Sequence, residues 1–161
     1  MKKKNNNKGF TLVELIVVLV ILAILAAILI PALLGYIDRA KEKQYVLNAK
    51  SALTATQAEF SSLYGEGLDL TDSNKKFVRS SVVMNTADTP KGSKFYVKIT
   101  ATPSTITGNP AVPSNHEHYT VKDAIYVENG YYCKFTGTTW ETTQTDPGVS
   151  NYTLIYEVPT N

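Results

Sequence analysis

The residues best suited to catalysis or metal binding do not form a convincing site in this sequence. His116, Glu117 and His118 combine imidazole and carboxylate groups, which are ligand types that Zn²⁺ accepts. They follow Pro113-Ser114-Asn115, a composition typical of a polar loop, and we interpret the whole stretch as one. Cys133 would become a nucleophile only if the fold placed one of these histidines beside it as a base, and nothing in the spacing does so. The sequence therefore predicts no enzymatic activity, no metal and no cofactor.

One carboxylate lies in an unusual place. Glu14 follows the start of an apolar segment that runs from Phe10 to about Ile37. A charged side chain at the centre of a membrane helix costs about 2.5–3.5 kcal/mol on insertion scales, and less near the edge. Some interaction of Glu14 must offset that cost.

The apolar segment is long enough to cross a membrane. No residue from Leu15 to Ile37 is charged, and a helix of this length spans roughly 34 Å against a hydrocarbon core of roughly 30 Å. The apolar region of a cleaved secretory signal is shorter, about 7–15 residues, although scattered alanines leave a hidden cleavage site as an alternative. Four lysines precede the helix, so the positive-inside rule predicts a cytoplasmic N-terminus and an external remainder.

The charge balance argues against nucleic-acid binding. Residues 1–9 hold four of the 16 basic residues, which leaves 12 basic against 14 acidic residues in the rest of the chain. The formal charge of +2 therefore reflects the N-terminal lysines and does not indicate a basic protein.

Pro31 and Gly35 lie in the far part of the apolar helix. Proline lacks the N–H that would bond to the carbonyl of Ala27. The two interpretations are a simple kink and a weak point that stretches when the helix packs into an assembly.

The sequence Lys8-Gly9-Phe10-Thr11-Leu12-Val13-Glu14-Leu15-Ile16 resembles the start of type IV prepilins and the related pseudopilins. The resemblance covers roughly residues 1–36: a short basic leader ending in Gly9, then Phe10, then Glu14 at the fifth position after the cut, and an apolar helix with Pro31. It implies that a prepilin peptidase cuts between Gly9 and Phe10 and methylates the new N-terminal Phe10.

The resemblance also implies a role for Glu14. The amine freed at Phe10 has a reference pKa near about 8 and is largely positive at neutral pH. It lies one helical turn from Glu14, within reach of a pair in the same chain. In a stack of staggered helices, the family implies instead a pair with the amine of a neighbouring subunit, which sets the axial register. The alternative for Glu14 is a solvated carboxylate at the membrane edge.

A second, amphipathic half of the helix is expected beyond the membrane. Apolar or small residues recur at steps of three and four over residues 36–64: Val46, Ala49, Leu53, Thr56, Phe60 and Leu63. Gly65 and Gly67 are expected to end the helix. A further short helix is predicted over residues 75–84, capped by Asp72-Ser73-Asn74, with a strand at residues 82–84 as the alternative.

The remainder predicts an antiparallel β-sheet. Strand formers fill residues 94–100, 119–128, 131–135 and 152–158, and Asn129-Gly130 is a strong hairpin signal. The residues Gly137-Thr138-Thr139-Trp140 suggest a turn into another strand. Cys133 is the only cysteine, so no disulfide forms within the chain. Here the sequence departs from many Gram-negative pilins and fits the Gram-positive type. We expect Cys133 to be a small core residue.

These features predict an α+β pilin fold, in which a long N-terminal helix packs on a C-terminal antiparallel sheet. The expected parts are a leader (1–9), a transmembrane or filament-core half-helix (10–35) and a globular domain (36–161). The implied function is a structural subunit of a surface filament. The implied partners are other copies of the chain, the prepilin peptidase, an inner-membrane platform, an ATPase motor and the membrane. The alternatives are a pseudopilin of a secretion or competence machine, and a monomeric single-pass surface-binding protein.

Overall fold

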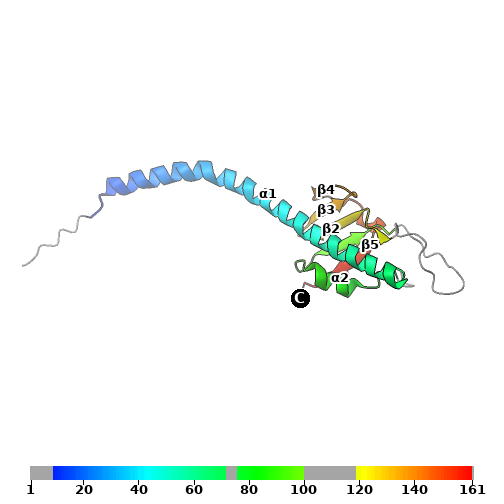
Figure 1. Cartoon of the computed structure of the whole chain (residues 1–161). Coiled ribbons are helices and arrows are strands. Elements are labelled where there is room, and N and C mark those ends of the chain that lie inside the picture. Colours follow the sequence, from blue (N-terminus) through cyan, green and yellow to red (C-terminus); the bar gives the residue numbers. More distant parts are fainter. Residues whose placement is uncertain (1–8, 72–75, 100–118, 161) are drawn as a thin grey trace, which may run out of the picture. The chain divides into compact units, whose positions relative to one another are not determined.

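The computed structural model describes residues 9–71, 76–99 and 119–160. The chain divides into two compact units that meet between Lys41 and Glu42. Helix α1 (Leu12–Glu66) contributes to both units. The second unit also contains α2 (Ser80–Ala87), the short helix η2 (Val149–Asn151) and five strands (Figure 1): β1 (Lys94–Val97), β2 (Ala124–Glu128), β3 (Tyr131–Phe135), β4 (Trp140–Thr143) and β5 (Thr153–Glu157). The predicted α+β layout, with a long N-terminal helix and an antiparallel sheet, is confirmed.

The strands form one sheet in the order β4-β3-β2-β1-β5, and every neighbouring pair is antiparallel. The predicted hairpin joins β2 to β3, with Glu128 paired to Tyr131. Its two turn residues, Asn129 and Gly130, have φ values of 50° and 80°. A two-residue turn that matches the strand twist needs positive φ at both positions, and these residue types tolerate it.

The second half of α1 covers one face of the sheet through the predicted stripe. Ala49, Thr56, Phe60 and Leu63 are buried, while Val46 and Leu53 pack against the core from its margin. The opposing side chains include Tyr126 and Cys133, which pair across β2 and β3 and are fully buried. Asn48 Nδ2 donates a 2.8 Å hydrogen bond to Glu128 Oε2 and ties the helix to the end of β2. This confirms the buried helix face that the periodicity of residues 46–63 predicts.

Gly65 and Gly67 were both expected to end helix α1, and only Gly67 does so. Gly65 remains helical, and Gly67 has a φ of 69°. The Leu68 N–H donates to the Leu63 carbonyl at 2.9 Å and the Gly67 N–H to the Tyr64 carbonyl at 3.1 Å. This pair of bonds is the Schellman arrangement, which requires a left-handed residue at one position only. Gly67 supplies that position, so Gly65 is not a stop signal.

Helix α2 confirms the predicted short helix, and the alternative strand at residues 82–84 is wrong. The helix begins at Ser80, later than predicted, and its N-cap residue is Arg79, which makes no side-chain cap. The expected cap residues 72–74 lie outside the described residues.

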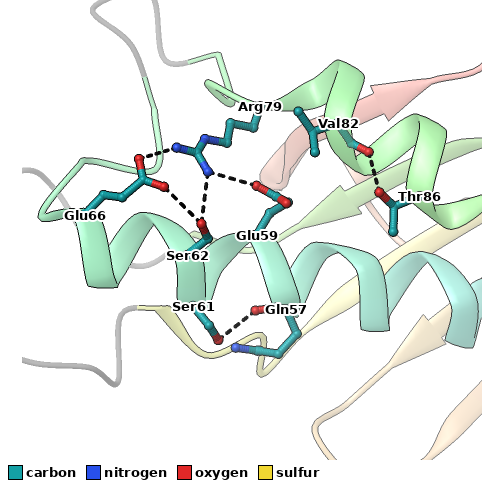
Figure 2. Close-up of polar contacts among 8 residues, drawn as sticks. All are labelled: Gln57, Glu59, Ser61, Ser62, Glu66, Arg79, Val82 and Thr86. Carbon is teal, nitrogen blue, oxygen red and sulfur yellow. Dashed lines mark hydrogen bonds and ion pairs between the residues drawn. The ribbon is translucent and has the colours of Figure 1, made fainter.

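At the start of α2, the N-cap residue Arg79 contacts α1 (Figure 2). The Arg79 guanidinium donates to Glu59 Oε2 at 3.2 Å, to Ser62 Oγ at 3.1 Å and also to Glu66, all on α1. Hydrogen bonds from Arg79 and Ser62 hold the pKa of the Glu66 carboxyl below its usual value. At the other end of α2, Ser51 Oγ donates to the Ala87 carbonyl at 2.6 Å. Helix α2 therefore runs antiparallel to α1 and is tied to it at both ends.

The segment that follows β4, residues 144–152, is called the strap. It joins β4 to β5, which lie at opposite edges, while α1 occupies the first face. Ile125 points away from α1, because it neighbours Tyr126 in the strand, yet it is fully buried. Asp146 Oδ1 accepts from the N–H groups of Gly148 and Val149, and the Tyr152 hydroxyl donates to Asp123 Oδ1 at 2.9 Å. Burial and this last bond raise the pKa of Tyr152 to about 12.

The Tyr152→Phe variant tests whether that hydrogen bond holds the strap. We expect the free energy of unfolding to fall by about 0.5–1.5 kcal/mol, the usual net value of one hydrogen bond. Urea denaturation of the full chain in detergent measures it. Tyr132→Phe is the matched control, because Tyr132 is a half-buried tyrosine of β3 whose hydroxyl makes no hydrogen bond within the described residues. Equal stability of the two variants would contradict the role of the bond.

Candidate functional site

The expected cleavage point lies at an accessible part of the chain. Gly9 and Phe10 precede α1 and are both exposed, and the Phe10 side chain is 83% exposed. A Cβ atom built on Gly9 would meet no atom within 4 Å, and Gly9 does not adopt a positive φ. Nothing in this chain's own conformation therefore demands a glycine at position 9.

Thr11 and Glu14 form a reciprocal cap at the start of α1. The Thr11 N–H and hydroxyl both donate to Glu14 Oε2 at 2.8 Å, and the Glu14 N–H donates to Thr11 Oγ1 at 3.3 Å. This is a capping box, in which a threonine and a glutamate three residues later satisfy two free backbone donors. Glu14 also places a negative charge in the first turn, where the helix dipole favours it.

Thr11 is the residue that the sequence analysis missed. The pattern Thr-x-x-Glu directly before an apolar run is the signature of a capping box, and it is present at residues 11–14. The cap gives Glu14 a hydrogen-bond partner, Thr11, in its own chain. This contact was not among the expected ones, which were a solvated carboxylate and a pair with the amine of Phe10. The Thr11 N–H would remain after a cut between Gly9 and Phe10, so the cap and an amine pair are compatible.

The first half of α1 exposes an unbroken apolar surface. Among the described residues it is the one helix long and apolar enough to cross a membrane, with a window of mean hydropathy 3.3 that is wholly unburied. Individual side chains range from Leu12, 73% exposed, to Ile37, 41% exposed. Such a surface needs lipid or other protein around it.

Pro31 and Gly35 both lie inside α1, which is helical on either side of them. Pro31 has no N–H to donate to the carbonyl of Ala27, and the helix continues through this position all the same. This placement does not separate the kink from the weak point, and the role of Pro31 in assembly stays a prediction.

Of the residues with catalytic potential, only Cys133 lies among those that the structure describes. His116, Glu117 and His118 lie outside the described residues. The described ranges hold no group of three His, Cys, Asp or Glu side chains that could bind a metal ion. Cys133 is fully buried at the centre of β3, and burial raises the pKa of its thiol to about 12, so it stays protonated at neutral pH. Cys133 is a core residue, as predicted.

Comparison with protein families supports the interpretation of the N-terminus. Residues 4–30 match the model of the prokaryotic N-terminal methylation motif, which is the type IV prepilin signal. The comparisons with curated proteins and with solved structures found no match. The match includes Gly9, Phe10, Thr11 and Glu14 and most of the apolar helix, and it leaves the globular unit unassigned.

Proposed function

We propose that this chain is the precursor of a structural subunit of a type IV pilus. The methylation motif and the exposed apolar helix behind it fit a pilin-like, membrane-anchored precursor. In the proposed sequence of events, the membrane holds the precursor through α1, and a prepilin peptidase cuts between Gly9 and Phe10. The same enzyme methylates Phe10, and the processed chain leaves the membrane for a filament on the cell surface.

The observation that carries the proposal is the apolar half of α1. Large side chains of the helix are about half exposed or more, and none of the window that could span a membrane is buried. After extraction from lipid this apolar surface has to be covered. Parallel copies of the same helix can cover it, because each copy presents the same apolar surface to its neighbours. In this proposal residues 10–35 form the filament core and residues 36–161 form the globular domain.

Glu14 is proposed to set the register of that core. In a low-dielectric bundle an unpaired carboxylate is costly, and the amine of Phe10 supplies the opposite charge. The donors that Thr11 gives to Glu14 in the capping box are neutral groups, so the box itself does not neutralise the negative charge of Glu14. A stagger that brings each Glu14 to the amine of the neighbouring copy neutralises every pair.

The mature N-terminus tests the proposal directly. We expect mass spectrometry of filaments sheared from cells to show subunits that begin at Phe10 and carry one N-terminal methyl group. An intact Met1, or a cut beyond Ala23, would overturn the proposal in favour of a retained anchor or an ordinary secretory signal.

Two other functions would also account for the methylation motif or for the apolar helix. A pseudopilin of a secretion or competence machine would be processed in the same way and would form a short structure, so filament length in electron micrographs separates it from a pilus subunit. A monomeric single-pass surface protein would need neither the cut at Gly9 nor a polymer. The assembly platform and the ATPase motor belong to the proposal as the partners that a polymerised pilin requires.

A further inference from the structure

An open groove runs along one flank of α1 in the globular unit. Its first part is a hollow of about 410 Å³ lined by Val46, Leu47, Lys50 and Trp140, together with Glu42, Lys43 and Thr142. Its second part, of about 450 Å³, is lined by Leu53, Thr54, Ala58 and Phe135, among others. The α1 residues of the two parts follow one another along the helix, so we treat them as one groove.

The groove and α2 lie on opposite flanks of α1. The sheet residues of the groove come from β3 and β4, whereas α2 packs toward β5 at the other edge of the sheet. Phe135 and Trp140 form the wall on the sheet side, with ring centroids 5.1 Å apart. Leu47, which lines the first part of the groove with Trp140, is 59% exposed.

The opposite flank carries a ridge, defined as Val78 and Val82. Val78 lies in the turn before α2 and Val82 in the first turn of that helix, and their side chains are 44% and 42% exposed. At the far end of α2, Asp88 is exposed and adopts the left-handed conformation of a C-cap. The ridge therefore combines apolar side chains near one end of α2 with a carboxylate at the other.

The charges of the two flanks are complementary. Lys43 and Lys50 are exposed at the first part of the groove, and with Glu42 they leave it a net positive charge. The carboxyl end of α2 carries the negative end of the helix dipole in addition to Asp88. Helix α2 is antiparallel to α1, so Asp88 and the ridge follow one another in the same direction as Lys50 and the second part of the groove, which carries no charged residue.

We propose that the ridge of one copy docks into the groove of the next copy, with Asp88 facing Lys43 or Lys50. This inference rests on the proposed function, in which the α1 helices of neighbouring subunits are parallel. Parallel copies present unlike flanks to each other, so the contact is heterologous and extends without closing on itself. The groove would then be a lateral contact between globular domains, distinct from the helical core of the filament.

Cysteine cross-linking tests which surfaces meet. Filaments assembled from a mixture of Thr54→Cys chains and Val82→Cys chains, and from a mixture of Leu47→Cys and Val82→Cys chains, are treated with a mild oxidant. A disulfide needs Cα atoms within about 7 Å, so only facing positions react. We expect covalent dimers from at least one mixture and none from any single variant, because position 82 meets the groove and not another position 82. Wild-type filaments serve as the control for Cys133, which is buried.

A charge exchange tests the same contact without a new covalent bond. We expect Asp88→Lys alone, and Lys43→Glu with Lys50→Glu, each to reduce the number of filaments per cell. A chain that carries all three changes is expected to recover much of the loss. Normal filaments without mixture-specific dimers, or a triple variant no better than the others, would overturn the docking while leaving the proposed function intact. A wild-type chain that is unprocessed and forms no filament would instead overturn the proposed function.

Discussion

The Glu14→Gln variant is expected to be cut and methylated normally but to form no filaments. Glutamine is also found at this position of a capping box, so the Thr11 N–H and hydroxyl keep an acceptor of the same size. What glutamine removes is the negative charge. If the charge of Glu14 pairs with the amine of a neighbouring Phe10, the neutral side chain leaves that amine unpaired in the bundle, where an isolated charge is costly. Electron microscopy of the cells and mass spectrometry of the membrane-bound subunit measure the two outcomes separately.

Two other variants separate the cap from the charge. Glu14→Val removes both, and we expect it to behave like Glu14→Gln in assembly, with processing retained. Thr11→Ala removes the hydroxyl of the cap and keeps the charge, at a cost of about 1 kcal/mol to the helix start. Its filaments are expected to be present. Normal filaments from Glu14→Gln together with their loss in Thr11→Ala would mean that Glu14 serves the helix cap and not the register.

The local elements of the fold could be predicted because the signals for them are local. The apolar steps of Val46, Ala49 and Phe60 follow the period of one helix face, and Asn129-Gly130 has the backbone freedom that its turn requires. The capping box at Thr11 is equally local and could have been found from the same sequence. The sequence analysis treated Glu14 as a charge, at the membrane edge or paired with the amine of Phe10, and not as an acceptor for backbone donors.

The remaining features depend on contacts between residues far apart in the chain. Helix α2 starts where Arg79 reaches Glu59 and Glu66 on α1, and a guanidinium in a sequence does not reveal its partners. The place of the fully buried Ile125 in an inner strand, between β3 and β1, also comes from long-range pairing. Periodicity identifies a strand and its faces, but it does not give its neighbours. The groove beside Trp140 escaped prediction for the same reason, since its walls come from α1, β3 and β4.

The Gly9→Val variant is expected to accumulate as an uncut precursor in the membrane and to form no filaments. The fold does not explain a glycine here, because the backbone conformation is ordinary and an added side chain would meet nothing within 4 Å. We therefore attribute the requirement to the peptidase, whose site must accept the residue directly before the cut. Immunoblots of membrane fractions would show a single larger band, and mass spectrometry would show residues 1–9 still attached.

The matched control is Gly65→Ala, which adds one methyl group at a glycine where the structure also has open space. Gly65 lies in the last turn of α1, where alanine is the better helix former, so processing and assembly are expected to be unchanged.

In the uncut Gly9→Val chain the nitrogen of Phe10 remains an amide without charge, while the cap between Thr11 and Glu14 needs only residues that are still present. The precursor thus keeps a capped helix and lacks the cation that Glu14 is proposed to bind. Filaments built from subunits that retain residues 1–9 would show that the freed amine is not required for assembly.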